Sequence, residues 1–154
     1  MSHPSHHLAQ INVGTLKAPL GTPEMSGFTD QLDPINALAD RSPGFVWRLV
    51  GDGEGDATGL RPFGDDILVN LSVWEDVASL WDFTYRTEHL ELLRQRRSWF
   101  ERFSAAHLAL WWIPAGTVPT LKEAGERLET LHEKGPTPAA FTLRSAFDPP
   151  ATPQ

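Results

Sequence analysis

Four short segments of the chain are rich in apolar residues, and several are bounded by glycine or proline, which is typical of β-strands. The first alternates in part between apolar and polar positions and ends at Gly14, as a half-buried strand does. The third places Asn70 and Ser72 on one face and apolar side chains on the other. The four predicted strands are His7–Gly14, Phe45–Val50, Ile67–Trp74 and His107–Ile113.

The segment between the first two strands carries apolar residues at steps of three and four, which predicts an amphipathic helix. These apolar positions are Met25, Phe28, Leu32, Ile35 and Ala39. Pro34 lies inside this helix and lacks a backbone donor, so we expect a kink near Asp33 or a restart of the helix.

The longest helical stretch runs from Glu75 to Phe103 and contains an elbow at Tyr85–Glu88, where Thr87 can cap a second segment. In that second segment, one stripe at helical spacing combines apolar residues with His89 and Arg96. The stripe predicts that both of these polar side chains lie on the buried side of the helix.

A last helix opens with the capping box Thr120–Glu123 and stops at Gly135. The element order is thus strand–helix–strand twice, followed by one extra helix. Two such units merged into one antiparallel sheet give an α+β, ferredoxin-like βαββαβ sandwich with an extra C-terminal helix. Strand positions on both sides of the pleat are apolar, as at Trp111 and Trp112, so a second subunit is expected to cover the open face.

Composition narrows the class of protein. The 154 residues correspond to one domain, which we place at residues 6–147 with flexible tails at 1–5 and 148–154. The net charge of −7 argues against nucleic acid or anionic lipid as a partner, and the absence of a long apolar run predicts a cytoplasmic protein. The chain has no cysteine, whereas six tryptophans indicate a large core, an aromatic pocket or an oligomer interface.

The histidines and acidic residues do not form a metal motif, and we expect no metal. The first and last strands are neighbours in the predicted antiparallel sheet, so His7 and His107 lie at opposite ends and cannot share a metal ion. The acidic stretch 51–56 lacks the twelfth-position glutamate of a calcium loop. A glycine-rich phosphate loop, a nucleophile elbow and a zinc-protease motif are also missing, which argues against nucleotide and hydrolase functions.

The stretch Val73–Phe83, followed by Tyr85 and His89, resembles the strand-to-helix signature of dimeric α/β-barrel proteins, which include antibiotic-biosynthesis and haem-degrading monooxygenases. One uncharacterised branch, a family of domains of unknown function, is similar in the segments His7–Gln10, Ser42–Arg48, Val69–Trp74 and Gly135–Pro138. The resemblance covers residues 6–147. It implies a homodimer in which two sheets close into a barrel, with a small-molecule cavity between sheet and helices in each protomer. It implies no particular reaction.

Haem-degrading members of this superfamily carry a ligand histidine a few turns after a catalytic tryptophan. Alignment of the chain on Trp74 puts Phe83 and Leu93 at those two positions, so both defining residues are missing. His89 lies one turn earlier and reaches a haem iron only if the helix is rotated or the register shifts at the elbow. We therefore expect no cofactor and keep haem as a lesser alternative.

The candidate catalytic residues are His89, Arg96 and Tyr85. His89 and Arg96 lie two turns apart on one face, where an imidazole can act as a base and a guanidinium can hold a phenolate or an enolate. Tyr85 is the single tyrosine and can donate to a ligand oxygen. Each of the three can instead serve the fold by satisfying a neighbouring polar group. The candidate substrate-binding residues are Asn70, Ser72, Trp74, Trp81, Trp99, Phe100, Arg48 and Trp112, with Gln10 and Asn12 as weaker cases.

These residues predict an enzyme that acts on a hydrophobic or aromatic small molecule, as a cofactor-independent monooxygenase, cyclase or isomerase. A substrate phenol or enol loses its proton to His89, while Arg96 and Asn70 stabilise the anion and aromatic walls exclude water. Two alternatives stay open: a non-catalytic dimer that binds a hydrophobic small molecule, and a haem-binding enzyme that uses His89.

Overall fold

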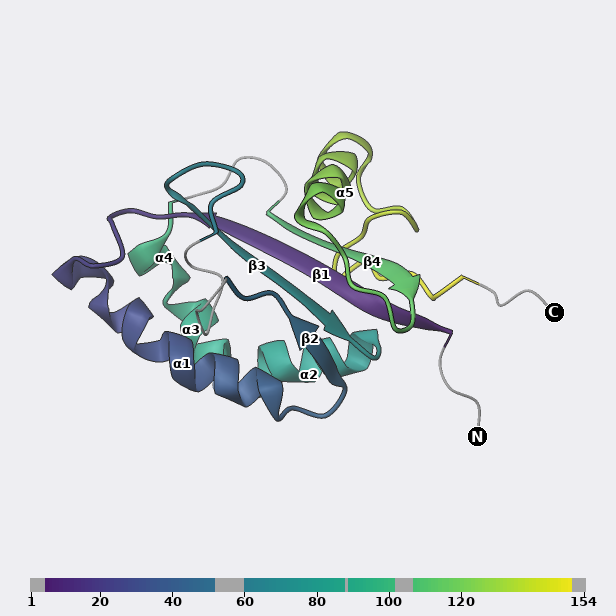
Figure 1. The fold of residues 1–154 in the computed structure, drawn as a ribbon, viewed down its shortest axis with the longest axis horizontal. Coiled ribbons are helices and arrows are strands. Elements are labelled where there is room, and N and C mark those ends of the chain that lie inside the picture. Colours follow the sequence, from purple (N-terminus) through teal and green to yellow (C-terminus); the bar gives the residue numbers. More distant parts are fainter. Residues whose placement is uncertain (1–4, 52–59, 88, 102–106, 151–154) are drawn as a thin grey trace.

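The computed structural model describes residues 5–51, 60–87, 89–101 and 107–150 (Figure 1). Its strands are β1 (His6–Thr15), β2 (Phe45–Arg48), β3 (Ile67–Trp74) and β4 (Leu108–Pro114). Its α-helices are α1 (Ser26–Asp40), α2 (Val77–Arg86), α3 (His89–Arg94), α4 (Arg96–Trp99) and α5 (Leu121–Lys134), with a 3-10 turn at Pro23–Met25 before α1. Each predicted strand is present, and β3 has the predicted bounds.

The four strands form one antiparallel sheet in the order β2-β3-β1-β4. This order, with α1 and α2 joining strands on the same face, is that of the ferredoxin-like sandwich, so the predicted fold class is confirmed. His7 faces Ile113 at one end of the β1–β4 pair, and at the other end the N–H of Val13 donates to the carbonyl of His107 at 2.9 Å. The two histidines therefore lie at opposite ends of the β1–β4 pair, as predicted.

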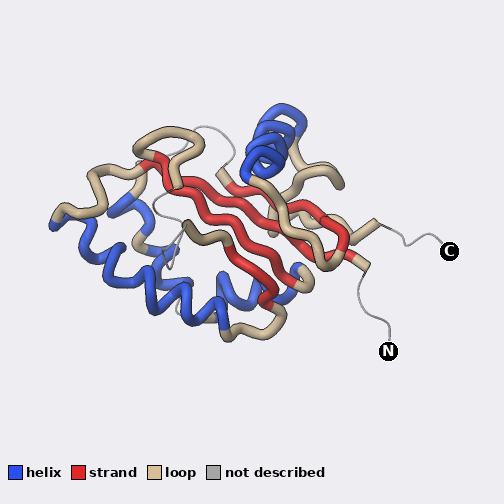
Figure 2. The backbone as a smooth tube through the Cα atoms, in the orientation of Figure 1, coloured by secondary structure: helices blue, strands red, loops and turns tan. Residues whose placement is uncertain are grey.

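Helices α1 to α4 cover one face of the sheet and α5 covers the other (Figure 1 and Figure 2). The strand residues under α5 are all buried: Ala9, Ile11, Val13, Val69, Leu71, Val73, Ala109, Trp111 and Ile113. Ala124 and Leu131 of α5 pack on them, and Leu60 and Phe63 from the segment before β3 lie alongside. The prediction that a second subunit covers this face is therefore wrong, because the chain buries it with its own helix.

Helix α1 continues through Pro34 as a single helix of 15 residues, so it does not restart as the sequence suggested. Pro34 is exposed, and the carbonyl of Asp30, which loses its helical donor, lies on the side where water can replace it. The uninterrupted helix carries Phe28, Leu32 and Asn36 at steps of four toward the sheet.

The predicted elbow in the long helical stretch is confirmed. Helix α2 ends at Arg86, and the hydroxyl of Thr87 accepts from the N–H of His89 at 3.2 Å, which caps the next segment. That segment consists of two short helices, α3 and α4. Glu88 and Phe103, which the sequence placed in the same stretch, lie outside the described residues.

Helix α5 is tied to the sheet by the residues that were predicted to form its capping box. The hydroxyl of Thr120 accepts from the N–H of Glu123 at 3.1 Å, as expected. The carboxylate of Glu123, however, accepts from the indole N–H of Trp111 at 2.7 Å. Arg127, one turn further on, lies over the Trp111 ring at 5.9 Å and donates to the carbonyl of Ala139 at 2.8 Å.

Much of the two predicted tails, 1–5 and 148–154, and of the acidic stretch 51–56 lies outside the described residues. The single domain at 6–147 stays a prediction. In the described part of the chain, no helix is both long enough and apolar enough to cross a membrane.

Candidate functional site

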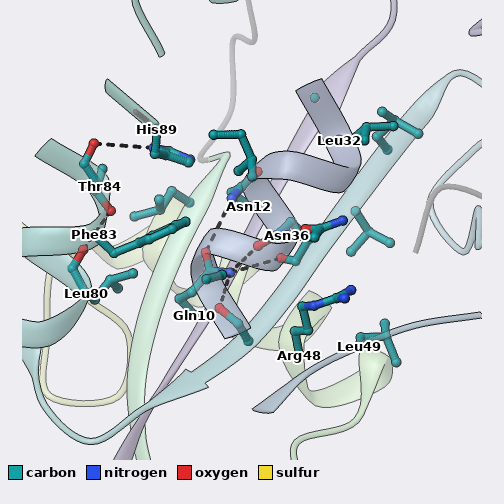
Figure 3. Close-up of a pocket in the computed structure, with 18 of the residues that line it drawn as sticks. Gln10, Asn12, Leu32, Asn36, Arg48, Leu49, Leu80, Phe83, Thr84 and His89 are labelled. Atoms are coloured by element: carbon teal, nitrogen blue, oxygen red, sulfur yellow. Dashed lines mark hydrogen bonds between the residues drawn. The ribbon is translucent and has the colours of Figure 1, made fainter. Parts of the chain in front are cut away.

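A pocket of about 240 Å³ lies between the sheet and helices α1 to α4 (Figure 3). It is somewhat smaller than the roughly 300–1,000 Å³ of sites for drug-sized ligands, which restricts it to a compact small molecule. The polar side chains on its floor come from β1 and β3 and are Gln10, Asn12, Asn70 and Ser72. Helix α1 adds Asn36, while His89 of α3 and Arg48 of β2 lie on opposite sides of the pocket in Figure 3.

The four polar floor residues are hydrogen-bonded to one another. Pairing of β1 with β3 sets Gln10 opposite Ser72 and Asn12 opposite Asn70 on one face of the sheet. Gln10 Nε2 donates to Asn70 Oδ1 at 2.5 Å and to Ser72 Oγ at 2.8 Å. Asn12 Nδ2 donates to Gln10 Oε1 at 3.4 Å, and the indole N–H of Trp74 donates to Ser72 Oγ at 2.9 Å.

This network has a fixed polarity, which orients the amide of Asn70. Gln10 Nε2 lies 3.4 Å from the backbone carbonyl of Asn70, which only accepts, so Gln10 points its nitrogen rather than its oxygen at Asn70. The side-chain oxygen of Asn70 is thereby engaged, and among the described residues its Nδ2 has no acceptor. The exposed Asn70 therefore offers an N–H donor to a ligand.

His89 enters the pocket from the first turn of α3. Its Nδ1 lies 3.3 Å from the backbone carbonyl of Thr84, which only accepts, so Nδ1 carries the proton and donates. Nε2 is then the acceptor of the neutral ring, and Figure 3 shows it on the side that faces away from Thr84. Burial lowers the pKa of His89 below its ordinary 6.5, against a smaller opposing effect of the Thr84 hydrogen bond. At neutral pH the side chain is therefore an uncharged base.

Aromatic side chains close both ends of the pocket. At one end the rings of Trp74 and Phe83 lie 5.1 Å apart. At the other end Phe28 lies 5.6 Å from Trp99 and 5.1 Å from Phe100. A polar floor between two aromatic ends fits a flat, largely apolar ligand that carries its oxygen atoms near the middle.

The charges near the pocket favour a ligand that is uncharged or becomes negative during reaction. Asp40 at the end of α1 accepts from Arg48 Nε at 2.8 Å and from Nη2 at 3.3 Å, and this paired geometry offsets the charge of Arg48. The described residues that line the pocket include no aspartate or glutamate. The net charge of −7 is therefore carried elsewhere on the chain.

The family model described as "Domain of unknown function (DUF3291)" matches residues 7–154. The chain belongs to the DUF3291 family. The resemblance to an uncharacterised branch of domains of unknown function is thereby confirmed. A search of curated proteins finds no match to the DUF3291 chain.

Two solved structures are similar to the DUF3291 chain at low sequence identity. A protein from Pseudomonas aeruginosa is 16% identical with a TM-score of 0.51, covering 75% of this chain and 100% of that one. SnoaB, a cofactor-independent oxygenase from Streptomyces nogalater, is 15% identical with a TM-score of 0.48, covering 75% of this chain and 97% of that one. The first likeness supports the fold alone, and activity has to be argued from the pocket.

The pocket of the DUF3291 chain brings together most of the residues that the sequence selected. The predicted site residues that line it are His89, Asn70, Ser72, Trp74, Trp99, Phe100 and Arg48. Gln10 and Asn12, the weaker cases, also line it and carry the hydrogen bonds of its floor.

Three predicted site residues are not among those that line the pocket. Trp81 and Tyr85 stack on each other with ring centroids 4.6 Å apart, and Trp81 is 38% exposed. Trp112 donates its indole N–H to the carbonyl of Phe147 at 2.8 Å.

A further predicted site residue, Arg96, begins α4, but its side chain lies outside the described part of the structure.

The break between α2 and α3 explains the position of Tyr85. In an unbroken helix Tyr85 and His89 would share a face, but α2 ends at Arg86 and the two side chains belong to different helices. Sequence reasoning missed Asn36, which lines the pocket from α1. The sequence could have indicated Asn36, because it lies four residues after Leu32 and so on the same helix face as the apolar stripe.

The described residues do not fit a haem. Nε2 of His89 is a suitable iron ligand, held through Nδ1 by a backbone carbonyl. The pocket of about 240 Å³, however, is below the roughly 300–1,000 Å³ of sites for drug-sized ligands, and a propionate-bearing macrocycle needs more. Arg48, which could face a propionate, is held by Asp40. Among the described residues, no three histidine or carboxylate side chains gather to hold a metal ion.

Proposed function

We propose that the pocket abstracts a proton from a small, hydrophobic, phenolic or enolisable substrate, as a cofactor-independent monooxygenase, cyclase or isomerase does. The observation that carries the proposal is the state of His89. Its Nδ1–H is held by the Thr84 carbonyl and its pKa is lowered, so Nε2 is an available base at neutral pH. Neutral amide donors and aromatic walls around it suit a reaction in which negative charge develops on an apolar molecule.

In the proposed first step, an acidic O–H or C–H bond of the substrate breaks and its proton moves to Nε2 of His89. The electron pair of that bond delocalises onto a substrate oxygen, as a phenolate or an enolate. Nδ2 of Asn70 donates to this oxygen, because Gln10 holds the other end of the Asn70 amide. Arg96 keeps its predicted role as a second donor to the anion.

The same anion serves each of the three reaction types. In an isomerase, the proton returns from His89 to a different carbon. In a cyclase, the carbanion attacks a carbonyl carbon of the same molecule and the new alkoxide takes the proton. In a monooxygenase, the carbanion adds dioxygen to form a hydroperoxide, which loses water, so that a CH₂ group and O₂ become C=O and H₂O.

Proton abstraction can be measured without knowledge of the natural substrate. We expect the protein to accelerate deuterium incorporation at the activated CH₂ group of 2-tetralone in D₂O, followed by NMR, above the rate with an equal concentration of imidazole. Exchange without oxygen uptake would point to an isomerase or a cyclase, and exchange with uptake to a monooxygenase. Binding of 2-tetralone with no exchange would favour the non-catalytic binding protein.

The exchange rate is expected to depend on pH through His89. Protonated His89 cannot accept a proton, so the protein-dependent exchange rate falls as pH decreases. The pH at which the rate is half its maximum should lie below 6.5, and the rate should not change with pH above 6.5. The same lowered pKa makes the unfolded chain bind a proton more readily, so stability also decreases below pH 6.5. Circular dichroism at each pH separates the two effects, and a half-maximum above pH 6.5 in folded protein would contradict the role of His89.

We further propose that two copies of the chain associate, as the resemblance to dimeric α/β barrels implies. The sheet face under α5 is already buried, and on the outer side of β4 Phe141 pairs with Leu110. The other outer strand is β2, where Val46 is 39% exposed, and Val50, just after the strand, is 42% exposed. An outer strand with exposed apolar residues supports pairing with a second copy.

Val46→Lys is expected to convert the dimer to a monomer, because the introduced charge would be buried in the contact. Light scattering coupled to size-exclusion chromatography measures the mass at equal protein concentrations. Val118→Lys, at a position that is 55% exposed after β4, is the matched control and is expected to stay dimeric. A monomeric wild type, or a dimeric Val46→Lys variant, would contradict this arrangement.

A further inference from the structure

Phe100 lies directly on Gly14 at one end of the pocket. A Cβ atom added to Gly14 would lie 2.6 Å from Cδ1 and 2.9 Å from Cε1 of the Phe100 ring. These distances are shorter than real side chains tolerate. Glycine is therefore needed at this point of β1 for the ring to rest on the sheet.

The position of Phe100 is fixed from several sides. The backbone on either side of it pairs with the end of β1, since the N–H of Lys17 donates to Trp99 and the N–H of Glu101 donates to Thr15, both at 2.9 Å. The ring meets Phe28 of α1 edge-on, with centroids 5.1 Å apart and planes at 89°. These contacts place the ring in the pocket wall.

The polar floor of the pocket ends at Phe100. Along β1 the residues on the pocket face are Gln10, Asn12 and then Gly14, so the polar floor ends where the Phe100 ring lies on Gly14. A ligand that places an oxygen on Asn70 has its apolar part directed along the floor, toward either aromatic end. The Trp74 end is closed by a side chain that is 1% exposed, which leaves the Phe100 end as the place where length is decided.

We propose that Phe100, seated on Gly14, is the end wall that limits the length of the ligand's apolar part. The substrate class is then a compact phenol or enol whose apolar extension stops at this ring. The inference rests on the proposed function only in the placement of the ligand oxygen at Asn70 and His89. A smaller residue at position 100 lengthens the pocket, and a larger one at position 14 drives the ring into it.

A series of 4-alkylphenols with growing alkyl chains tests the end wall by isothermal titration calorimetry. We expect the affinity of the wild type to rise about fourfold with each added methylene up to a limiting length, and to fall beyond it. Phe100→Ala should move that limit to longer chains, with Phe100→Leu moving it less in the same direction. Gly14→Ala should move it to shorter chains.

The double variant Gly14→Ala with Phe100→Ala separates an end wall from general damage to the fold. Removal of the ring removes the clash at Gly14, so the double variant should again accept chains at least as long as the wild type does. Met25→Ala serves as control, because Met25 packs in the same cluster but does not line the pocket. Its limiting length should equal that of the wild type.

The possible failures of this experiment are distinguishable. If no 4-alkylphenol binds the wild type, the end wall as proposed for phenols is wrong, whereas proton abstraction is judged separately by exchange into 2-tetralone. If the series binds but every variant keeps the same limiting length, the end wall alone is wrong. A limit that shifts equally in Met25→Ala would also overturn the inference, because it would show a loosened fold rather than a wall.

Discussion

We expect His89→Gln to lower the protein-dependent rate of deuterium exchange into 2-tetralone by about 10²-fold or more. Glutamine retains an amide that can donate to the Thr84 carbonyl, but it has no group that accepts a proton near neutral pH. Affinity for 2-tetralone should change little, because the aromatic ends of the pocket remain. The loss therefore falls on the chemical step, and exchange rates at saturating 2-tetralone measure it.

His132→Gln is the matched control for this prediction, since His132 is exposed on α5 at the other side of the sheet. Its exchange rate should equal that of the wild type. Both variants are checked by circular dichroism and by calorimetric binding of 2-tetralone. Undiminished exchange in a folded His89→Gln variant would remove the imidazole from the mechanism.

Trp111→Ala is expected to lower the free energy of unfolding by about 3–5 kcal/mol. The Trp111 side chain is fully buried between the sheet and α5, so its removal opens a large cavity. It also removes the donor to Glu123 at 2.7 Å and the ring beneath Arg127, which are two of the contacts that hold α5 on the sheet. Urea denaturation followed by circular dichroism measures the loss.

Two further variants separate burial from the loss of any tryptophan. Trp81→Ala carries the same substitution on α2, where the side chain is 38% exposed, and it should cost clearly less. Trp111→Phe retains most of the buried ring but not the indole N–H, so an intermediate loss is expected. Equal losses in Trp111→Ala and Trp81→Ala would show that burial under α5 does not set the cost of losing Trp111.

The strands and the ferredoxin-like order could be predicted because they depend on local patterns. The period of apolar residues locates β3 to the residue. Thr87 marks the break after α2 because threonine is favoured at the position that caps the start of a helix. The face of the sheet on which α5 packs could not be predicted from local patterns. An apolar stripe on a helix predicts burial but not the surface that it meets, so the second face of the sheet was assigned to another subunit.

The candidate site was predictable where a polar residue interrupts an apolar pattern. Asn70, Ser72 and His89 stood out in this way, and the structure brings them to one pocket. Their partners were harder to foresee, because the bond between Gln10 and Ser72 joins residues 62 positions apart and depends on strand register. Tyr85 was wrongly predicted to share a face with His89 for a related reason. A break in a helix changes the directions of the side chains before it relative to those after it.

The covering of the second sheet face by α5 makes each protomer complete without a partner. Separation of the two proposed copies and unfolding of each copy are then distinct steps, with a folded single chain between them. Dilution of the protein would separate the copies without melting them. The pocket, which the described residues of a single chain assemble, would persist at concentrations where no pair of chains forms.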